Sequence, residues 1–187
     1  MKKVFLSLFL IIGFSLYAQS FEWTLGLVDY KQSRSLDFSR PVNLKRGDAV
    51  NILVQSSADC WLYIIAQDSD RNVVVFHSGR IRAGEAYRSN PIQILPPSGQ
   101  DTIYIIVSRN QEKNLEERIA AYTKDNEFRN GRNVVSAVLE MRREILSLAE
   151  APDKPVPLGG AFRSYSDFEG RNYSGTYRYF KTILLNH

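Results

Sequence analysis

Short segments rich in β-branched and aromatic residues recur through the first half of the chain, and this spacing constrains the fold more than any other feature of the sequence. Turn-forming residues separate the segments, for example at Arg46-Gly47-Asp48 and at Pro96-Pro97-Ser98-Gly99. The strands expected from this pattern are Phe21 to Tyr30, Ala49 to Ser56, Cys60 to Gln67, Asn72 to His77, Ala86 to Ser89 with Ile92 to Leu95, and Thr102 to Ser108. Such short, regularly spaced strands predict an antiparallel sandwich or barrel rather than alternating strands and helices.

The hydrophobic period becomes helical after Ser108. A short helix is expected from Leu115 to Tyr122, with Asn114 and Glu117 spaced as a capping box at its start. A longer helix is expected from about Arg132 to Ala149. Its apolar residues are spaced alternately four and three apart, at Val134, Val138, Met141, Ile145 and Leu148. Because one helix cannot keep such a stripe in water, we expect it to pack on the sandwich.

The C-terminal part is expected to return to strands. Prolines and glycines predict a loop over residues 151–160, and strands are expected at Ala161 to Tyr165 and at Thr176 to Leu185, with a polar stretch containing glycines between them. The fold class is therefore mainly β (α+β): an antiparallel β-sandwich with a two-helix insertion, about residues 114–149, before the C-terminal strands. Residues 19–187 are of the size of a single domain.

The N-terminus has the plan of a secretory signal peptide. Lys2 and Lys3 precede an apolar run from Val4 to Leu16, and the small residue Ala18 suits a signal peptidase. The run is shorter than the roughly 20 residues that span a bilayer as a helix. We therefore expect residues 1–18 to be removed and the chain to be exported to the periplasm or the medium, with no stable transmembrane segment; an uncleaved anchor is the alternative.

Charge and cysteine content narrow the possible partners. The formal charge is +4, and removal of the two lysines at the N-terminus leaves about +2. Basic and acidic residues are interspersed, which is not the pattern of a nucleic-acid-binding protein, so no nucleic acid is expected as a partner. Cys60 is the one cysteine and cannot form an intrachain disulfide; its apolar surroundings predict a buried, inert thiol.

The sequence offers little for catalysis or metal binding. Of two histidines, His187 is the last residue and is expected to be disordered, which leaves His77. One cysteine and one usable histidine do not supply a zinc site. The spacing Asp68-x-Asp70-x-Asn72 opens like a calcium loop but lacks the later glycine and glutamate, so a plain hairpin turn is expected. We expect no cofactor, no bound metal and no catalytic residue.

One enzymatic alternative stays open. It is a hydrolase with an unfamiliar site around His77 and nearby acids. The acids from which a carboxylate pair could be drawn are Glu85, Asp101, Asp167 and Glu169, and their spacing singles out no pair.

Aromatic and basic residues gather near the C-terminus, the mixture that carbohydrate and protein recognition uses. The aromatic residues are Phe162, Tyr165, Phe168, Tyr173, Tyr177, Tyr179 and Phe180, and the basic ones are Arg163, Arg171, Arg178 and Lys181. The residues expected to bind are Arg163, Tyr165, Tyr177 and Arg178, with another envelope protein or a glycan as the partner. The alternation around Tyr179 is equally typical of an edge strand that buries one face.

The stretch from Leu44 to Ile119 resembles the bacterial family catalogued as domain of unknown function 4384. The resemblance rests on Leu44-Lys45-Arg46-Gly47-Asp48-Ala49-Val50, Asp59-Cys60-Trp61-Leu62-Tyr63-Ile64, the Asp68-Ser69-Asp70 turn before Val73-Val74-Val75-Phe76, Ile81-Arg82-Ala83-Gly84-Glu85 and Thr102-Ile103-Tyr104-Ile105-Ile106-Val107-Ser108-Arg109. It implies a β-sandwich accessory module of an exported bacterial protein and no established activity. The expected function is a non-catalytic accessory or binding module of the bacterial cell envelope.

Overall fold

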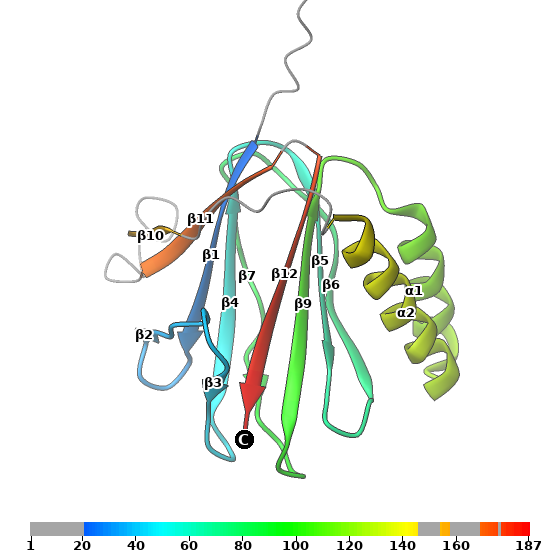
Figure 1. Ribbon diagram of the computed structural model, residues 1–187, viewed down its shortest axis with the longest axis horizontal. Helices are drawn as coiled ribbons and strands as arrows, with labels where there is room; N and C mark the ends of the chain where they lie inside the picture. The colour runs from blue at the N-terminus through cyan, green and yellow to red at the C-terminus, as the bar shows by residue number, and fades with distance from the viewer. Residues whose placement is uncertain (1–20, 146–153, 158–168, 176) are drawn as a thin grey trace, which may run out of the picture.

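The protein is a β-sandwich with a layer of two helices on one side (Figure 1). The computed structural model describes residues 21–145, 154–157, 169–175 and 177–187. The strands and helices are, in order, β1 (Phe21–Asp29), β2 (Arg34–Ser35), β3 (Val42–Asn43), β4 (Ala49–Ser56), β5 (Cys60–Gln67), β6 (Val73–Ile81), β7 (Ala86–Arg88), β8 (Ile92–Gln93), β9 (Gln100–Ser108), α1 (Lys113–Asp125), α2 (Phe128–Ile145), β10 (Lys154–Pro157), β11 (Glu169–Gly175) and β12 (Arg178–Asn186). The predicted fold class, mainly β with two helices between the first strands and the last ones, is confirmed.

Two sheets face each other. The first has the strand order β10-β11-β1-β4-β7, with β2 beside β1 and β8 beside β4, and the second has the order β3-β12-β9-β5-β6. All pairings are antiparallel except the short one between β12 and β3. The chain changes sheet between β4 and β5 and again between β6 and β7, so the two sheets are built from interleaved parts of the sequence.

The core between the two sheets is formed by alternate residues of the strands. For this reason, the strands with the clearest hydrophobic pattern form where the sequence predicts them. Alternate residues of β4, such as Ile52 and Val54, point from the first sheet toward Ile64 and Ile105 of the second, and all four are inaccessible to solvent. Trp23 lies in the same core, stacked on Tyr173 of β11 with ring centroids 4.8 Å apart. Burial of these side chains is the main favourable term that holds the two sheets together.

The helices cover the outer face of the second sheet (Figure 1). The predicted stripe on the longer helix is buried as far as it is described: Val134, Val138 and Met141 pack in one cluster with Tyr63 and Ile106 of the sheet. At Gly131 the longer helix lies close to the first helix and to β6, since a Cβ there would lie 3.3 Å from atoms of both Tyr122 and Val73. The expectation that this helix packs on the sandwich is confirmed. Leu148 and the side chain of Ile145 lie outside the description.

Both helices begin earlier than predicted. The first starts at Lys113, so Asn114 lies inside it and accepts a hydrogen bond from Arg118 Nε (3.0 Å) instead of capping the helix. The residue at the cap is Glu112, whose side chain makes no capping hydrogen bond. The second helix starts at Phe128, one turn before the predicted Arg132. The predicted capping box is therefore wrong.

Two strands lie where the sequence predicts a loop or a polar linker. Strand β10 forms within the predicted loop at residues 151–160, and its prolines, Pro155 and Pro157, are tolerated because it is the outermost strand of its sheet. Strand β11 forms despite Gly170 and Gly175, because Tyr173 fills the core beside Trp23. The predicted strand at 161–165 lies outside the described residues.

The structure differs from the sequence-based expectations for both histidines. His77 does not end its strand, since β6 continues to Ile81. His187 is ordered: its backbone exchanges two hydrogen bonds with Gly99 (2.8 and 2.9 Å), and its side chain is 4 % exposed with Nε2 3.2 Å from Asp101 Oδ1. The prediction that the C-terminal residue is disordered is therefore wrong.

Within the described residues, neither helix is long and apolar enough to cross a membrane. Three regions of the fold are candidates for a functional site. They are the start of β12, the environment of His77, and the turns at the opposite end of the sandwich.

Candidate functional site

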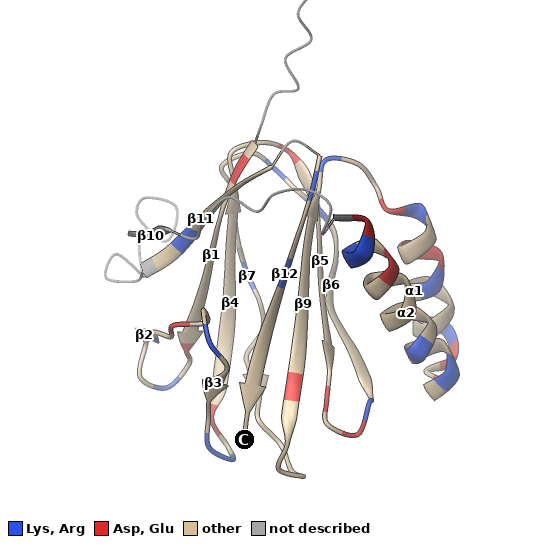
Figure 2. Cartoon of the chain, viewed as in Figure 1, with Lys and Arg blue, Asp and Glu red and all other residues tan. Residues whose placement is uncertain are grey.

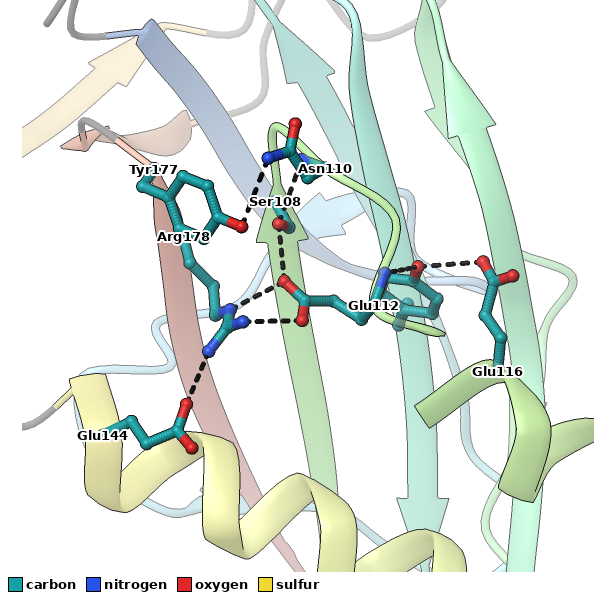
Figure 3. Close-up of polar contacts among 8 residues, drawn as sticks. Ser108, Asn110, Glu112, Glu116, Glu144, Tyr177 and Arg178 are labelled. Carbon is teal, nitrogen blue, oxygen red and sulfur yellow. Dashed lines mark hydrogen bonds and ion pairs between the residues drawn. The ribbon is translucent and has the colours of Figure 1, made fainter. Parts of the chain in front are cut away.

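Two of the four predicted binding residues, Tyr177 and Arg178, lie together at the start of β12 (Figure 3). The other two, Arg163 and Tyr165, lie outside the described residues. Strand β12 pairs along its whole length with β9, so Arg178 lies opposite Ser108, at the point where the chain leaves β9 for the first helix. The start of one strand and the end of another thus bring residues far apart in sequence to one end of the sheet.

Arg178 forms a bidentate ion pair with Glu112 (Figure 3). Its Nε donates to Glu112 Oε1 at 2.7 Å and its Nη2 to Oε2 at 2.6 Å, and the remaining Nη1 donates to Glu144 Oε2 at 2.9 Å. The side chains of Arg178 and Glu112 are 15 % and 11 % exposed, whereas Glu144 is 68 % exposed. Burial disfavours the charge on Arg178, but the hydrogen bonds and the attraction of the two carboxylates outweigh it and raise its pKa.

The network continues from Glu112 to the two neighbouring strands. Ser108 Oγ donates to Glu112 Oε1 (2.7 Å), and the backbone N–H of Glu112 donates to Tyr63 Oη (3.0 Å). Tyr63 Oη donates in turn to Glu116 Oε1 (2.9 Å). Burial, together with the adjacent carboxylates, raises the pKa of Tyr63, which keeps the phenol protonated and a donor. Every described member of this network has a partner, which is how buried polar groups are stabilised.

The guanidinium of Arg178 connects one strand of the sheet to both helices. Through Arg178, β12 is tied to the start of α1 at Glu112 and to the last turn of α2 at Glu144. A carboxylate in the last turn of a helix is unfavourable because of the helix dipole, and the guanidinium offsets that cost. The arrangement holds the helices against the sheet, and its one aliphatic hydroxyl, that of the fully buried Ser108, is taken up by its hydrogen bond to Glu112.

Tyr177 has a different role in the same place. Its side chain is 47 % exposed, its Oη accepts a hydrogen bond from Asn110 Nδ2 (3.2 Å), and Arg178 lies over its ring at 5.6 Å from the centroid. Its backbone carbonyl accepts from Arg109 N (2.9 Å). The ring is thus fixed at its hydroxyl, at one face and at its backbone while it remains open to solvent.

His77, on which the enzymatic alternative depends, is partly buried on β6, the strand at the edge of the second sheet. Its ring lies 4.4 Å from that of Tyr87, across the gap between the sheets, and burial lowers its pKa. A bulge after Ile64 shifts the register of β5 and β6, which places the extra residue Phe76 before His77. No carboxylate contributes to the shift in its pKa. Within the described part of the chain, the structure therefore places His77 in contact with an aromatic ring.

Two of the four acids named with it, Asp101 and Glu85, are engaged elsewhere. Asp101 accepts a hydrogen bond from Ser69 N (3.1 Å) and contacts His187, and Glu85 accepts from Arg82 N (3.2 Å). Asp167 and the side chain of Glu169 lie outside the description.

The predicted turn at Asp68 is confirmed. The Asp68 carboxylate accepts hydrogen bonds from the backbone and side-chain nitrogens of Asn72 (2.7 and 2.8 Å), which closes the turn between β5 and β6. Among the residues that the structure describes, no three His, Cys, Asp or Glu side chains gather as metal ligands would. Cys60 is 1 % exposed, as expected, and burial raises the pKa of its thiol.

No family model, curated protein or solved structure matches this chain. The resemblance of Leu44 to Ile119 to the family of unknown function therefore stays a prediction, and the site has to be interpreted from its own geometry.

Sequence reasoning missed Glu112 and Glu144 as partners of Arg178, and Ser108 and Tyr63 as partners of Glu112. Glu112 and Arg178 are 66 positions apart and meet only because β12 pairs with β9. The one signal available was chemical: a lone arginine in the alternating apolar stretch that follows Tyr177 needs an acidic partner if its strand is buried on both faces.

Proposed function

We propose that this chain is an exported, non-catalytic binding module of the bacterial cell envelope, and that Tyr177 is the centre of its binding surface. The observation that supports it is the exposed Tyr177 ring, held by Asn110 at the hydroxyl and by Arg178 at one face. A fixed aromatic side chain loses little conformational entropy when a partner covers it, so it supplies contact area at low cost.

The buried network behind the ring favours recognition over chemistry. Because the mostly buried Arg178 is paired with Glu112 and Glu144 and lies over the Tyr177 ring, we assign it the support of the ring rather than the main contact with a partner. The sequence-based hypothesis names both Tyr177 and Arg178 as binding residues, and the proposal assigns the contact with the partner to Tyr177. The partner is a surface that accepts a flat ring, either another envelope protein or a glycan.

The experiment is capture by cross-linking in native envelopes, with single-residue variants. Tyr177→Ala should lose the cross-linked partner, while Phe128→Ala, which removes a ring of similar exposure (52 %) at the start of α2, should keep it. Both variants should retain the wild-type circular dichroism spectrum, because neither ring is buried.

Two results would overturn the proposal. One is a partner that Phe128→Ala loses as readily as Tyr177→Ala, which would indicate general surface stickiness. The other is substrate turnover by the purified protein that His77→Ala abolishes without a change in thermal stability, which would establish the hydrolase alternative.

A further inference from the structure

Three turns meet at the end of the sandwich opposite Tyr177, and hydrogen bonds between them, one from a lysine side chain and the others between backbones, fix their relative positions. Lys31 Nζ, in the turn after β1, donates to Gly47 O (2.7 Å), in the turn before β4. Gly47 N donates to Ile94 O (3.1 Å), and Ile94 N donates to Asp48 O (2.9 Å), which ties in the loop after β8. Gly47 has a φ of +81°, a conformation that suits glycine and allows this tight turn.

Two large apolar side chains project from these turns. Leu95 is 62 % exposed and Tyr30 is 49 % exposed, and they are two of the five large hydrophobic residues that the described part of the chain leaves exposed. Each stands next to a residue of the hydrogen-bonded junction, since Tyr30 N donates to Ala49 O (2.8 Å) and Leu95 follows Ile94. The scaffold therefore holds both apolar tips at the same end of the molecule.

Cations surround these tips. Lys31, Arg34, Lys45 and Arg46 are all exposed, and the turn that joins β3 to β4 is blue in Figure 2. The two acids in these turns bind backbone N–H groups: Asp29 is 7 % exposed and accepts from the backbone N–H groups of Lys31 and Gln32 (2.9 and 2.8 Å). Asp48 accepts from Lys45 N (2.7 Å). The carboxylates of Asp29 and Asp48 thus bind within the turns. Lys31 also binds within the junction through Gly47 O, while the residues Arg34, Lys45 and Arg46 are exposed.

We propose that this surface, which we call the basal patch (Tyr30, Lys31, Arg34, Lys45, Arg46 and Leu95), docks on an anionic lipid bilayer. The occupant follows from charge and shape. Exposed cations meet the phosphates of acidic headgroups, and two separate apolar tips enter the boundary between headgroups and acyl chains, where each can be buried on its own. A tyrosine suits that boundary because its ring is apolar and its hydroxyl stays hydrated.

Docking in this way would stand the sandwich on the membrane with Tyr177 at the far end, open to a partner. This inference does not depend on the proposed role of Tyr177, because it uses other residues and another assay.

The test is cosedimentation of the protein with lipid vesicles, using the processed form that its host accumulates. Binding to phosphatidylcholine vesicles that contain phosphatidylglycerol is compared with binding to vesicles of phosphatidylcholine alone. The wild type should bind the anionic vesicles, and binding should weaken as the salt concentration rises. Lys45→Gln combined with Arg46→Gln should lower the partition coefficient by roughly fivefold for each cation removed. Tyr30→Ser combined with Leu95→Ser should lower it by at least about tenfold.

The matched control removes two cations from another face. Lys113→Gln combined with Arg143→Gln, both exposed, in the first turn of α1 and the last turn of α2, should leave vesicle binding within about twofold of wild type. All variants should keep the wild-type circular dichroism spectrum, because the exchanged side chains are exposed.

Several outcomes would overturn the proposal. Equal loss of binding in the control shows that net charge acts without regard to place, and equal binding to neutral vesicles shows that cations do not contribute. A protein that ignores both vesicles but binds polyglutamate identifies the basal patch as a surface for acidic proteins instead.

Discussion

The ion pair between Arg178 and Glu112 allows one sharp prediction about stability. Arg178→Met keeps the length and apolar part of the side chain but leaves the Glu112 carboxylate, 11 % exposed, with Ser108 as its remaining described donor. Removing one partner of a buried pair costs about 3 to 5 kcal/mol, and the residual exposure here favours the lower end, about 3 kcal/mol. With a urea m-value of about 2 kcal/mol/M, the unfolding midpoint should fall by about 1.5 M.

Two companion variants test the reasoning behind that figure. Glu144→Gln removes a 68 % exposed partner of the same guanidinium and should cost about 0.5 kcal/mol. Arg178→Met combined with Glu112→Met removes both charges and should recover much of the lost stability, because no unpaired charge stays buried. The measurement is urea denaturation followed by far-ultraviolet circular dichroism. If Arg178→Met unfolds at the same urea concentration as Glu144→Gln, the network does not hold the helices and the argument fails.

Three further predictions concern other parts of the fold. Val138→Asp, at a fully buried site between helix and sheet, should destabilise the protein by about 3 kcal/mol or more. Arg143→Asp, on the exposed face of the same helix, should change the free energy of unfolding by less than about 0.5 kcal/mol. Equal denaturation midpoints for the two variants would contradict the packing of this helix. Because burial in the folded state lowers the pKa of His77 below its ordinary value of about 6.5, the unfolded chain takes up the proton more readily, so stability should fall as the pH drops through and below about 6.5. His77→Phe should lose that dependence, and an unchanged pH profile would refute the assignment. Cys60 should react slowly with a thiol reagent in the native protein and rapidly after denaturation, and fast native labelling would show that the 1 % exposure is wrong.

The strands that the sequence predicts are those whose pattern and burial agree. In β4, β5 and β9, runs of valine and isoleucine are buried on both faces, so local propensity and tertiary packing favour the same structure. Strand β11 shows the limit. Its glycines and polar residues predict a linker, and it becomes a strand because Tyr173 pairs with Trp23 on a neighbouring strand 150 positions earlier in the sequence.

The candidate site was predictable only in part. An exposed tyrosine beside an arginine could be selected by residue type, and Tyr177 does lie exposed at the end of the sheet. The partners of Arg178 could not, because they depend on which strand lies next to β12 and on how the helices return to the sheet. The same is true of the basal patch, whose three turns are brought together by hydrogen bonds to backbone carbonyls that leave no trace in the local sequence.

The central claim, export of a binding module, is tested most directly by the N-terminus of the protein in its host. Cells would be fractionated into cytoplasm, envelope and medium, and the protein in each fraction would be sequenced from its N-terminus. The account predicts a chain that begins at Gln19 or within a few residues of it, in the envelope or the medium. An intact Met1 on a protein that accumulates in the cytoplasm would contradict it.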